Sequence, residues 1–213
     1  NKKINQALSI LLFFTIPMTM GISFLSSDIW NVFYGSSTYG PSVLAYYIFL
    51  GLIIGLFTAT VSIVQVLKDY KTVIFSLFIG VVLKFLLNNN LMVAFVKMGL
   101  PAYYGVITAS LIGYFVSFLI CIIKLKIKYK VNYEEFSKNF IDTICGAMLM
   151  SIMLFLISLV LPSSNSRFVS LLHVIISVLL GAVVYFGYMW YSKAMNRVFG
   201  ERINKYLKKY KKV

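Results

Sequence analysis

One lysine and three asparagines stand inside the apolar segment "GVVLKFLLNNN" at residues 80–90. In a helix, residues four apart share one face, and such a row here is formed by Ser76, Gly80, Lys84 and Asn88. A lysine on that face could offer its positive charge to an anionic substrate in a water-accessible cavity. An earlier apolar segment carries a matching polar row, Thr58, Ser62 and Gln65. The candidate substrate-binding residues are therefore Lys84, Asn88, Ser76, Gln65 and Ser62.

The same lysine also has a structural interpretation. Its ammonium group could donate hydrogen bonds to asparagine side chains and backbone carbonyls, and so hold a bent helix. Lys84 lies roughly 18 Å from the nearer end of its segment, at about 1.5 Å per residue. A lysine at that depth costs about 2.5–3.5 kcal/mol on insertion scales, so it should face protein or a wet cavity. No acidic residue lies at the same depth, which disfavours an ion pair and a carboxylate-based proton or sodium site.

Enzyme and metal chemistry find little support in the sequence. The motifs of serine hydrolases, zinc proteases, P-loops and dinucleotide-binding folds are missing. The adjacent carboxylates Glu134 and Glu135 fall in a predicted loop, while His173 is the one histidine. Cys121 and Cys145 lie in apolar segments, where small buried hydrophobic residues are expected. We therefore expect a protein that is not an enzyme and that uses no metal or cofactor.

The composition indicates a protein whose solvent is largely lipid. Of its 213 residues 60% are hydrophobic and 12% are charged, and the mean hydropathy is +0.88. A soluble fold of this size could not cover so much apolar surface. The net charge of +14 could indicate nucleic acid, but in so apolar a chain it indicates a membrane surface instead.

Six apolar runs are long enough to cross the hydrocarbon core as helices. They predict an all-α polytopic membrane protein forming one membrane domain, with helices at about 7–27, 41–67, 72–96, 101–123, 140–161 and 168–192. Pro17 lies inside the first helix and should kink it, with Thr15 and Thr19 near enough to help satisfy the freed carbonyls. Small residues four apart predict close helix packing at Gly51 and Gly55, and at Gly105, Ala109 and Gly113.

The basic residues predict the orientation of these helices. Seventeen of the 20 lie at the N-terminus, near 68–71, at 124–138 and in a basic tail at 193–213. The alternate loops carry two, Lys97 and Arg167, and Lys84 is the remaining one. The positive-inside rule then places both termini in the cytoplasm, where the basic loops and tail could also meet anionic lipid headgroups.

Three segments resemble the MurJ-like, SpoVB-type polysaccharide flippases of the multidrug/oligosaccharidyl-lipid/polysaccharide exporter superfamily, whose multidrug exporters are MATE-like. They are "IPMTMGISFLSSDIWNVFYGSSTYGPSVL" at 16–44, "GVVLKFLLNNNLM" at 80–92 and "GVITASLIGYFVSFLICIIKLK" at 105–126. Their order and spacing match across about 16–126, and the count of helices beyond also matches. Lys84 and Asn88 match the family pattern residue by residue.

This resemblance implies a flippase for undecaprenyl-linked cell-wall or polysaccharide precursors such as lipid II, in the bacterial inner membrane. Its members have two helical lobes around a central cavity and work by alternating access. The first four helices here would complete the second lobe, and an upstream lobe would be a partner within the same protein. The last two helices would form a groove for the lipid tail, with a flexible apolar wall that includes Met148, Met150 and Met153.

Three rival interpretations stay open. A multidrug exporter of the same superfamily should carry acidic cavity residues, and a membrane scaffold or assembly protein should bury Lys84 without a cavity. An integral membrane enzyme of lipid-linked sugar synthesis should have clustered carboxylates, which this sequence lacks.

The charge pattern makes a testable prediction about topology. Single cysteines introduced at 31–38 should react with an impermeant thiol reagent added outside the cell, whereas cysteines at 127–133 should not. The opposite labelling pattern would overturn the six-helix orientation.

Overall fold

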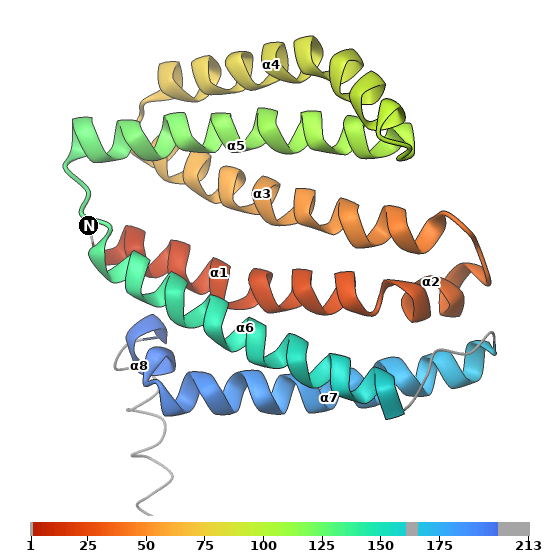
Figure 1. Ribbon diagram of the computed structural model, residues 1–213. Coiled ribbons are helices and arrows are strands. Elements are labelled where there is room, and N and C mark those ends of the chain that lie inside the picture. The colour runs from red at the N-terminus through yellow and green to blue at the C-terminus, as the bar shows by residue number, and fades with distance from the viewer. Residues whose placement is uncertain (1, 161–165, 200–213) are drawn as a thin grey trace, which may run out of the picture. The chain divides into compact units, whose positions relative to one another are not determined.

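The computed structural model describes residues 2–160 and 166–199. Six of the helices in these ranges are long and apolar enough to cross a membrane, which confirms the predicted all-helical polytopic fold. The chain divides into two compact units (Figure 1). Unit 1 comprises residues 1–37 and 133–213, and unit 2 comprises residues 38–132. The predicted tail residues 200–213, and Pro162, lie outside the described ranges.

Unit 2 is a three-helix unit in which α5 packs against both of the other helices. The helices are α3 (Gly40–Val66), α4 (Tyr70–Lys97) and α5 (Ala102–Tyr129). Pro41 occupies the first turn of α3 and Pro101 precedes α5, where a missing N–H removes no intrahelical bond.

Unit 1 joins the two ends of the chain. Its helices are α1 (Lys2–Phe24), α2 (Ser26–Tyr34), α6 (Glu134–Val160), α7 (Arg167–Tyr191) and α8 (Ala194–Phe199). Here α6 packs against α1 and α7, while α2 packs against α7. The sequence did not predict α2: the first helix ends at Phe24, and a separate amphipathic helix follows where a loop was expected.

The C-terminal ends of α3, α5 and α7 share an uncommon feature. Lys68, Lys130 and Lys193 all adopt the left-handed conformation, with φ of 59°, 50° and 56°. Glycine usually takes this position because it has no Cβ to crowd the backbone. A lysine there places a positive charge at the negative end of the helix dipole. Nearby, the Lys128 ammonium donates to Asp69 over 2.8 Å, and this hydrogen bond lowers the pKa of the Asp69 carboxyl, whose side chain is largely covered.

The contact between α4 and α5 depends on small residues. A Cβ added to Gly105 would come within 2.5 Å of the Met92 backbone nitrogen, and one added to Gly113 would come within 2.7 Å of the Gly80 oxygen. Ala109, between these two glycines, is fully buried. The Ser117 hydroxyl continues the row and donates across the contact to the Ser76 carbonyl, over 2.8 Å.

Unit 1 satisfies the backbone defect of its proline through a distant residue. α1 runs as one helix through Pro17, which has no N–H to donate to the carbonyl of Phe13. The Tyr185 hydroxyl on α7 donates to that oxygen over 2.6 Å. Thr15, which was expected to help, instead donates to the Leu11 carbonyl. Tyr185 and Phe13 are both buried. The hydroxyl on α7 therefore supplies the hydrogen-bond donor that α1 lacks at Pro17.

We expect Gly113→Leu to destabilise unit 2 by more than the roughly 1–3 kcal/mol typical of overpacking, because the added side chain would meet backbone atoms. The matched control is Gly55→Leu, since a Cβ on Gly55 meets nothing within 4 Å in the described chain. Thermal melting of both purified variants tests this, and Leu111→Ala reports an ordinary loss of apolar contact. Similar losses for the two glycine variants would contradict the packing role.

A double-mutant cycle tests the bond to the proline-freed carbonyl. Tyr185→Phe should cost about 1–3 kcal/mol, because it leaves the buried Phe13 oxygen without a donor. In a Pro17→Ala background the alanine N–H can bond to that oxygen, so the same tyrosine change should cost clearly less. Equal losses in the two backgrounds, measured by chemical or thermal unfolding, would show that Tyr185 does not compensate for Pro17.

Candidate functional site

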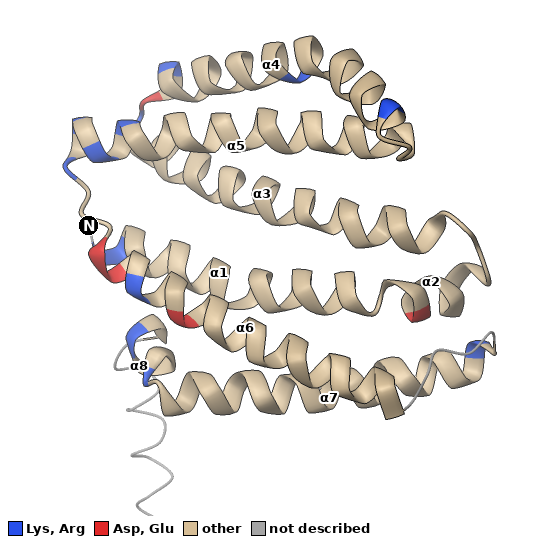
Figure 2. Ribbon diagram, viewed as in Figure 1, with Lys and Arg blue, Asp and Glu red and all other residues tan. Residues whose placement is uncertain are grey.

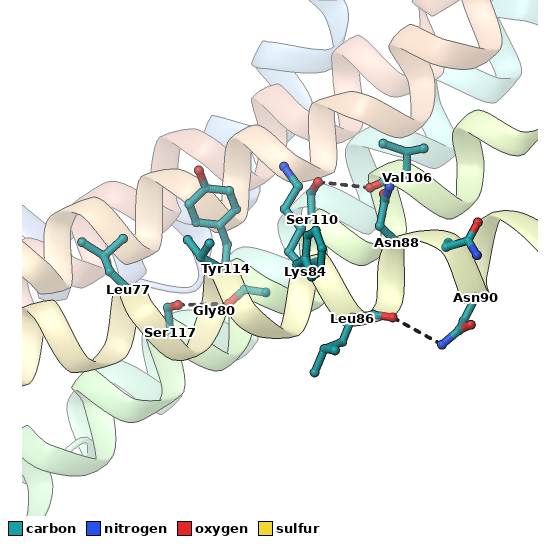
Figure 3. Close-up of a pocket in the computed structure, with 14 residues that line it drawn as sticks. Leu77, Gly80, Lys84, Leu86, Asn88, Asn90, Val106, Ser110, Tyr114 and Ser117 are labelled. Carbon is teal, nitrogen blue, oxygen red and sulfur yellow. Dashed lines mark hydrogen bonds between the residues drawn. The ribbon is translucent and has the colours of Figure 1, made fainter.

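A groove of about 810 Å³ runs along α4 and α5 within unit 2. Its lining is largely apolar around a short row of polar side chains, and it comprises Leu77, Gly80, Val81, Lys84, Phe85, Leu86, Asn88, Asn89, Asn90, Val106, Ser110, Gly113, Tyr114 and Ser117. Figure 3 shows Lys84, Asn88 and Tyr114 pointing to the same side, whereas Asn90 points away from them. The helical row predicted from the sequence thus lies partly on the groove wall.

Lys84 is the cation of this groove. Its side chain is exposed, and no ion pair or hydrogen bond holds it among residues 2–160 and 166–199. The stem is fixed by the close helix contact, since a Cβ on Gly113 would lie 3.2 Å from the Lys84 Cβ. Figure 2 shows that the other charges of these helices gather near their ends. Lys84 therefore presents a positive charge to the groove in mid-helix.

Asn88 lies one helical turn beyond Lys84 and has spare hydrogen-bonding capacity. Its Nδ2 makes a long contact of 3.9 Å with the Met92 sulfur. Its Oδ1 is buried and has no hydrogen-bond partner in the part of the chain that is described. A buried amide oxygen without a donor is costly, so a ligand donor at this point would be favoured. The Asn90 side chain instead bonds within its own helix, where its Nδ2 donates to the Leu86 carbonyl over 3.3 Å.

The structure does not bring the other three candidates to the groove. Ser76 is fully buried in the α4–α5 contact, where its hydroxyl donates to the Val73 carbonyl and receives the Cys121 thiol. Ser62 and Gln65 are exposed on α3 and do not line the groove. The Ser62 hydroxyl donates to the Thr58 carbonyl one turn earlier.

The predicted packing residues of α3 and α5 have different surroundings in the structure. A Cβ on Gly51 or Gly55 would meet nothing within 4 Å in the described chain, whereas Gly105, Ala109 and Gly113 lie in a helix contact. Small residues four apart permit another helix to approach closely, but they do not determine whether a helix packs there.

Sequence reasoning missed the contribution of α5 to the groove. Ser110, Tyr114 and Ser117 line it opposite the Lys84 row, at helical spacings of four and three. Ser110 donates to the Val106 carbonyl over 3.0 Å, which leaves its oxygen lone pairs to the groove. This polar row, immediately beside the small-residue row of α5, is the signal that could have identified it.

An apolar cavity of about 330 Å³ lies within unit 1. Its walls come from α1, α2, α6 and α7, and they include Phe13, Pro17, Met150, Gly181 and Tyr185. Met150 lines the cavity, whereas Met148 and Met153 do not, so the predicted methionine wall is only partly present there. The lining is almost wholly hydrocarbon and aromatic, and it suits an aliphatic chain.

Comparison with known proteins adds evidence from homology. The chain is 28% identical to the lipid II flippase MurJ of Bacillus subtilis (strain 168), over 217 aligned positions. The alignment covers 98% of this chain and 39% of that protein. No protein-family model matches the chain, and no solved structure matches it significantly. The chain is thus a distant, MurJ-like homologue of a membrane transporter, and it spans about 39% of that relative's length.

Proposed function

We propose that this chain is the C-terminal part of a flippase that moves undecaprenyl-linked saccharide precursors across the bacterial inner membrane. The observation that carries the proposal is Lys84, a cation with no ion-pair partner among the described residues, in a groove of about 810 Å³ on a helix long and apolar enough to cross a membrane. Similarity to a lipid II flippase supports this class of cargo. Lipid II itself is one member of that class.

The groove supports binding of the polar headgroup. An ammonium group is a compact point charge that suits a diphosphate, and Lys84 holds it away from other charges of unit 2. Asn88 Oδ1 can accept a hydrogen bond from a saccharide hydroxyl or amide, and Ser110 and Tyr114 add polar contacts. The apolar cavity of unit 1 would hold part of the polyprenyl tail, which stays in a hydrocarbon environment.

The transport cycle would be alternating access, with an upstream lobe completing the cavity. The positive charge of the groove would favour a headgroup with negative charge, and the basic loops would hold both termini in the cytoplasm. Anionic lipid headgroups would bind these loops. Pro17 stays a candidate bending element, because it removes one hydrogen bond within α1.

Two rivals fit the site less well. A multidrug exporter for cationic compounds would need a carboxylate, and no acidic residue is among the described residues that line the groove. A scaffold without a transport cycle would bury its intramembrane lysine against protein, whereas Lys84 is exposed to a groove.

Lys84→Met tests the proposal because methionine keeps the length of the side chain and removes the charge. In the complete protein we expect flipping of a lipid-linked saccharide, measured in reconstituted vesicles, to fall at least tenfold while the melting temperature stays near normal. Lys84→Arg should keep partial activity, since it retains the charge with a different geometry. Lys97→Met, near the end of the same helix and outside the groove, is the matched control.

The structural interpretation of Lys84 gives a different result. Loss of a lysine that satisfies buried carbonyls would cost about 1–3 kcal/mol of stability, and activity would fall together with stability. A stable and fully active Lys84→Met protein would contradict substrate binding at this residue.

A further inference from the structure

The short helix α2 is attached to α7 by polar side chains in an otherwise apolar environment. His173 Nδ1 lies 2.8 Å from Asp28 Oδ2, and the two side chains are 5% and 6% exposed. Three residues further along α2, Asn31 Nδ2 donates to the Ser170 hydroxyl over 2.9 Å. Ionisable residues buried in a membrane protein are costly, so such a pair calls for a role.

The geometry determines which nitrogen of His173 carries the proton. A carboxylate only accepts hydrogen bonds, so Nδ1 must be the donor to Asp28 Oδ2. In the neutral imidazole, Nε2 then carries the lone pair. Nε2 and Asp28 Oδ1 are both buried and have no hydrogen-bond partner among the described residues. The pair thus presents two buried acceptor atoms, and the Nε2 lone pair is the one that a proton can occupy.

No other charge in the described part of unit 1 stands in contact with this pair. On the packed helices α1, α6 and α8, the charged residues lie at the end remote from α2: Lys2, Lys3, Glu134, Glu135, Lys138, Asp142 and Arg197. Arg167 lies at the start of α7, beside Gly35 rather than the pair. The other titratable side chains of the unit 1 helices are Tyr34 on α2, Cys145 on α6, and Tyr185, Tyr188 and Tyr191 on α7. None of them forms a hydrogen bond with the pair.

We propose that Asp28 and His173 form a proton-binding site that controls the attachment of α2 to α7. A hydronium ion transfers its proton to the Nε2 lone pair: an N–H bond forms as one O–H bond of the hydronium breaks, a water molecule is released, and the pair changes from one net negative charge to none. The bond to Asp28 becomes charge-assisted on both sides, and such bonds are roughly twice as strong as neutral ones. Release of the proton reverses these changes and loosens α2.

The position of the site connects it to the apolar cavity of unit 1. Ile29, next to Asp28, lines that cavity, as does Ser177, one turn beyond His173. His173 also lies six residues into α7, roughly 9 Å from its start at about 1.5 Å per residue, so water is within a short distance. Looser attachment of α2 would therefore open a wall of the cavity. Control of the lipid-tail site rests on the proposed function, whereas proton binding does not.

Nitrogen NMR of the imidazole tests proton binding directly. The protein is labelled with ¹⁵N-histidine in lipid nanodiscs, and signals absent from His173→Gln identify His173. At about pH 8 we expect a proton on Nδ1 and a bare Nε2, and by about pH 5.5 a proton on both nitrogens in the folded protein. A proton on Nε2 with a bare Nδ1 at the higher pH, or a bare Nε2 until unfolding, would overturn the site.

Hydrogen exchange tests the control of α2. Glutamine at position 173 can donate to Asp28 but cannot take up a proton near neutral pH. The ratio of α2 amide exchange rates, His173→Gln over wild type, should rise about fivefold between pH 8 and pH 5.5, because only the wild type gains the stronger bond. The ratio for α5 amides should stay constant. A constant ratio for α2 as well would overturn the control of its attachment.

Asp28→Asn is the second variant, and it guards against a folding defect at position 173. The asparagine oxygen still accepts from Nδ1 but carries no charge, so the pH-dependent protection of α2 should shrink toward that of His173→Gln. Full retention of the wild-type response would show that the carboxylate is not part of the proton site. Neither measurement uses transport, so a failure of the flippase proposal would leave both results unchanged.

Discussion

In hydrocarbon a backbone N–H or C=O group must find its partner inside the protein, because no water can take its place. This constraint explains why the chain folds as long helices, and it also explains their tertiary contacts. Pro17 frees one carbonyl in α1, and the hydroxyl of Tyr185 arrives from α7 to bind it. Removal of one backbone donor therefore helps to fix the relative position of two helices.

The same constraint governs the contact between α4 and α5. With apolar solvent on every side, burial of hydrocarbon gives little drive for helices to associate, and close packing becomes the main attraction. Gly80, Gly105 and Gly113 allow the two backbones to approach until no Cβ would fit. The hydroxyl of Ser117 then bridges to the Ser76 carbonyl, so the polar atom at the contact is satisfied as well.

Polar atoms that remain unsatisfied under this constraint are informative. The described chain contains few of them, and two groups coincide with features that packing does not explain. Asn88 Oδ1 borders the Lys84 groove, and the free atoms of Asp28 and His173 lie between α2 and α7. A protein that satisfies even the carbonyl freed by a proline leaves these acceptors open, and both lie where a ligand or a proton could complete them.

The sequence by itself determined the membrane-spanning helices and singled out Lys84 and Asn88, because apolar length and a charge at depth are properties of the local chain. It also identified the small-residue row of α5. It could not determine which helix would pack against each row of small residues. Gly105 and Gly113 pack against the backbone of α4, whereas a Cβ on Gly51 or Gly55 would meet nothing within 4 Å in the described chain. The sequence also grouped Ser76, Ser62 and Gln65 with the site by their helical spacing, but these three residues do not line the groove. Only tertiary structure paired Tyr185 with the Phe13 carbonyl and Asp28 with His173, since residues 172 and 145 positions apart meet through packing that no local pattern records.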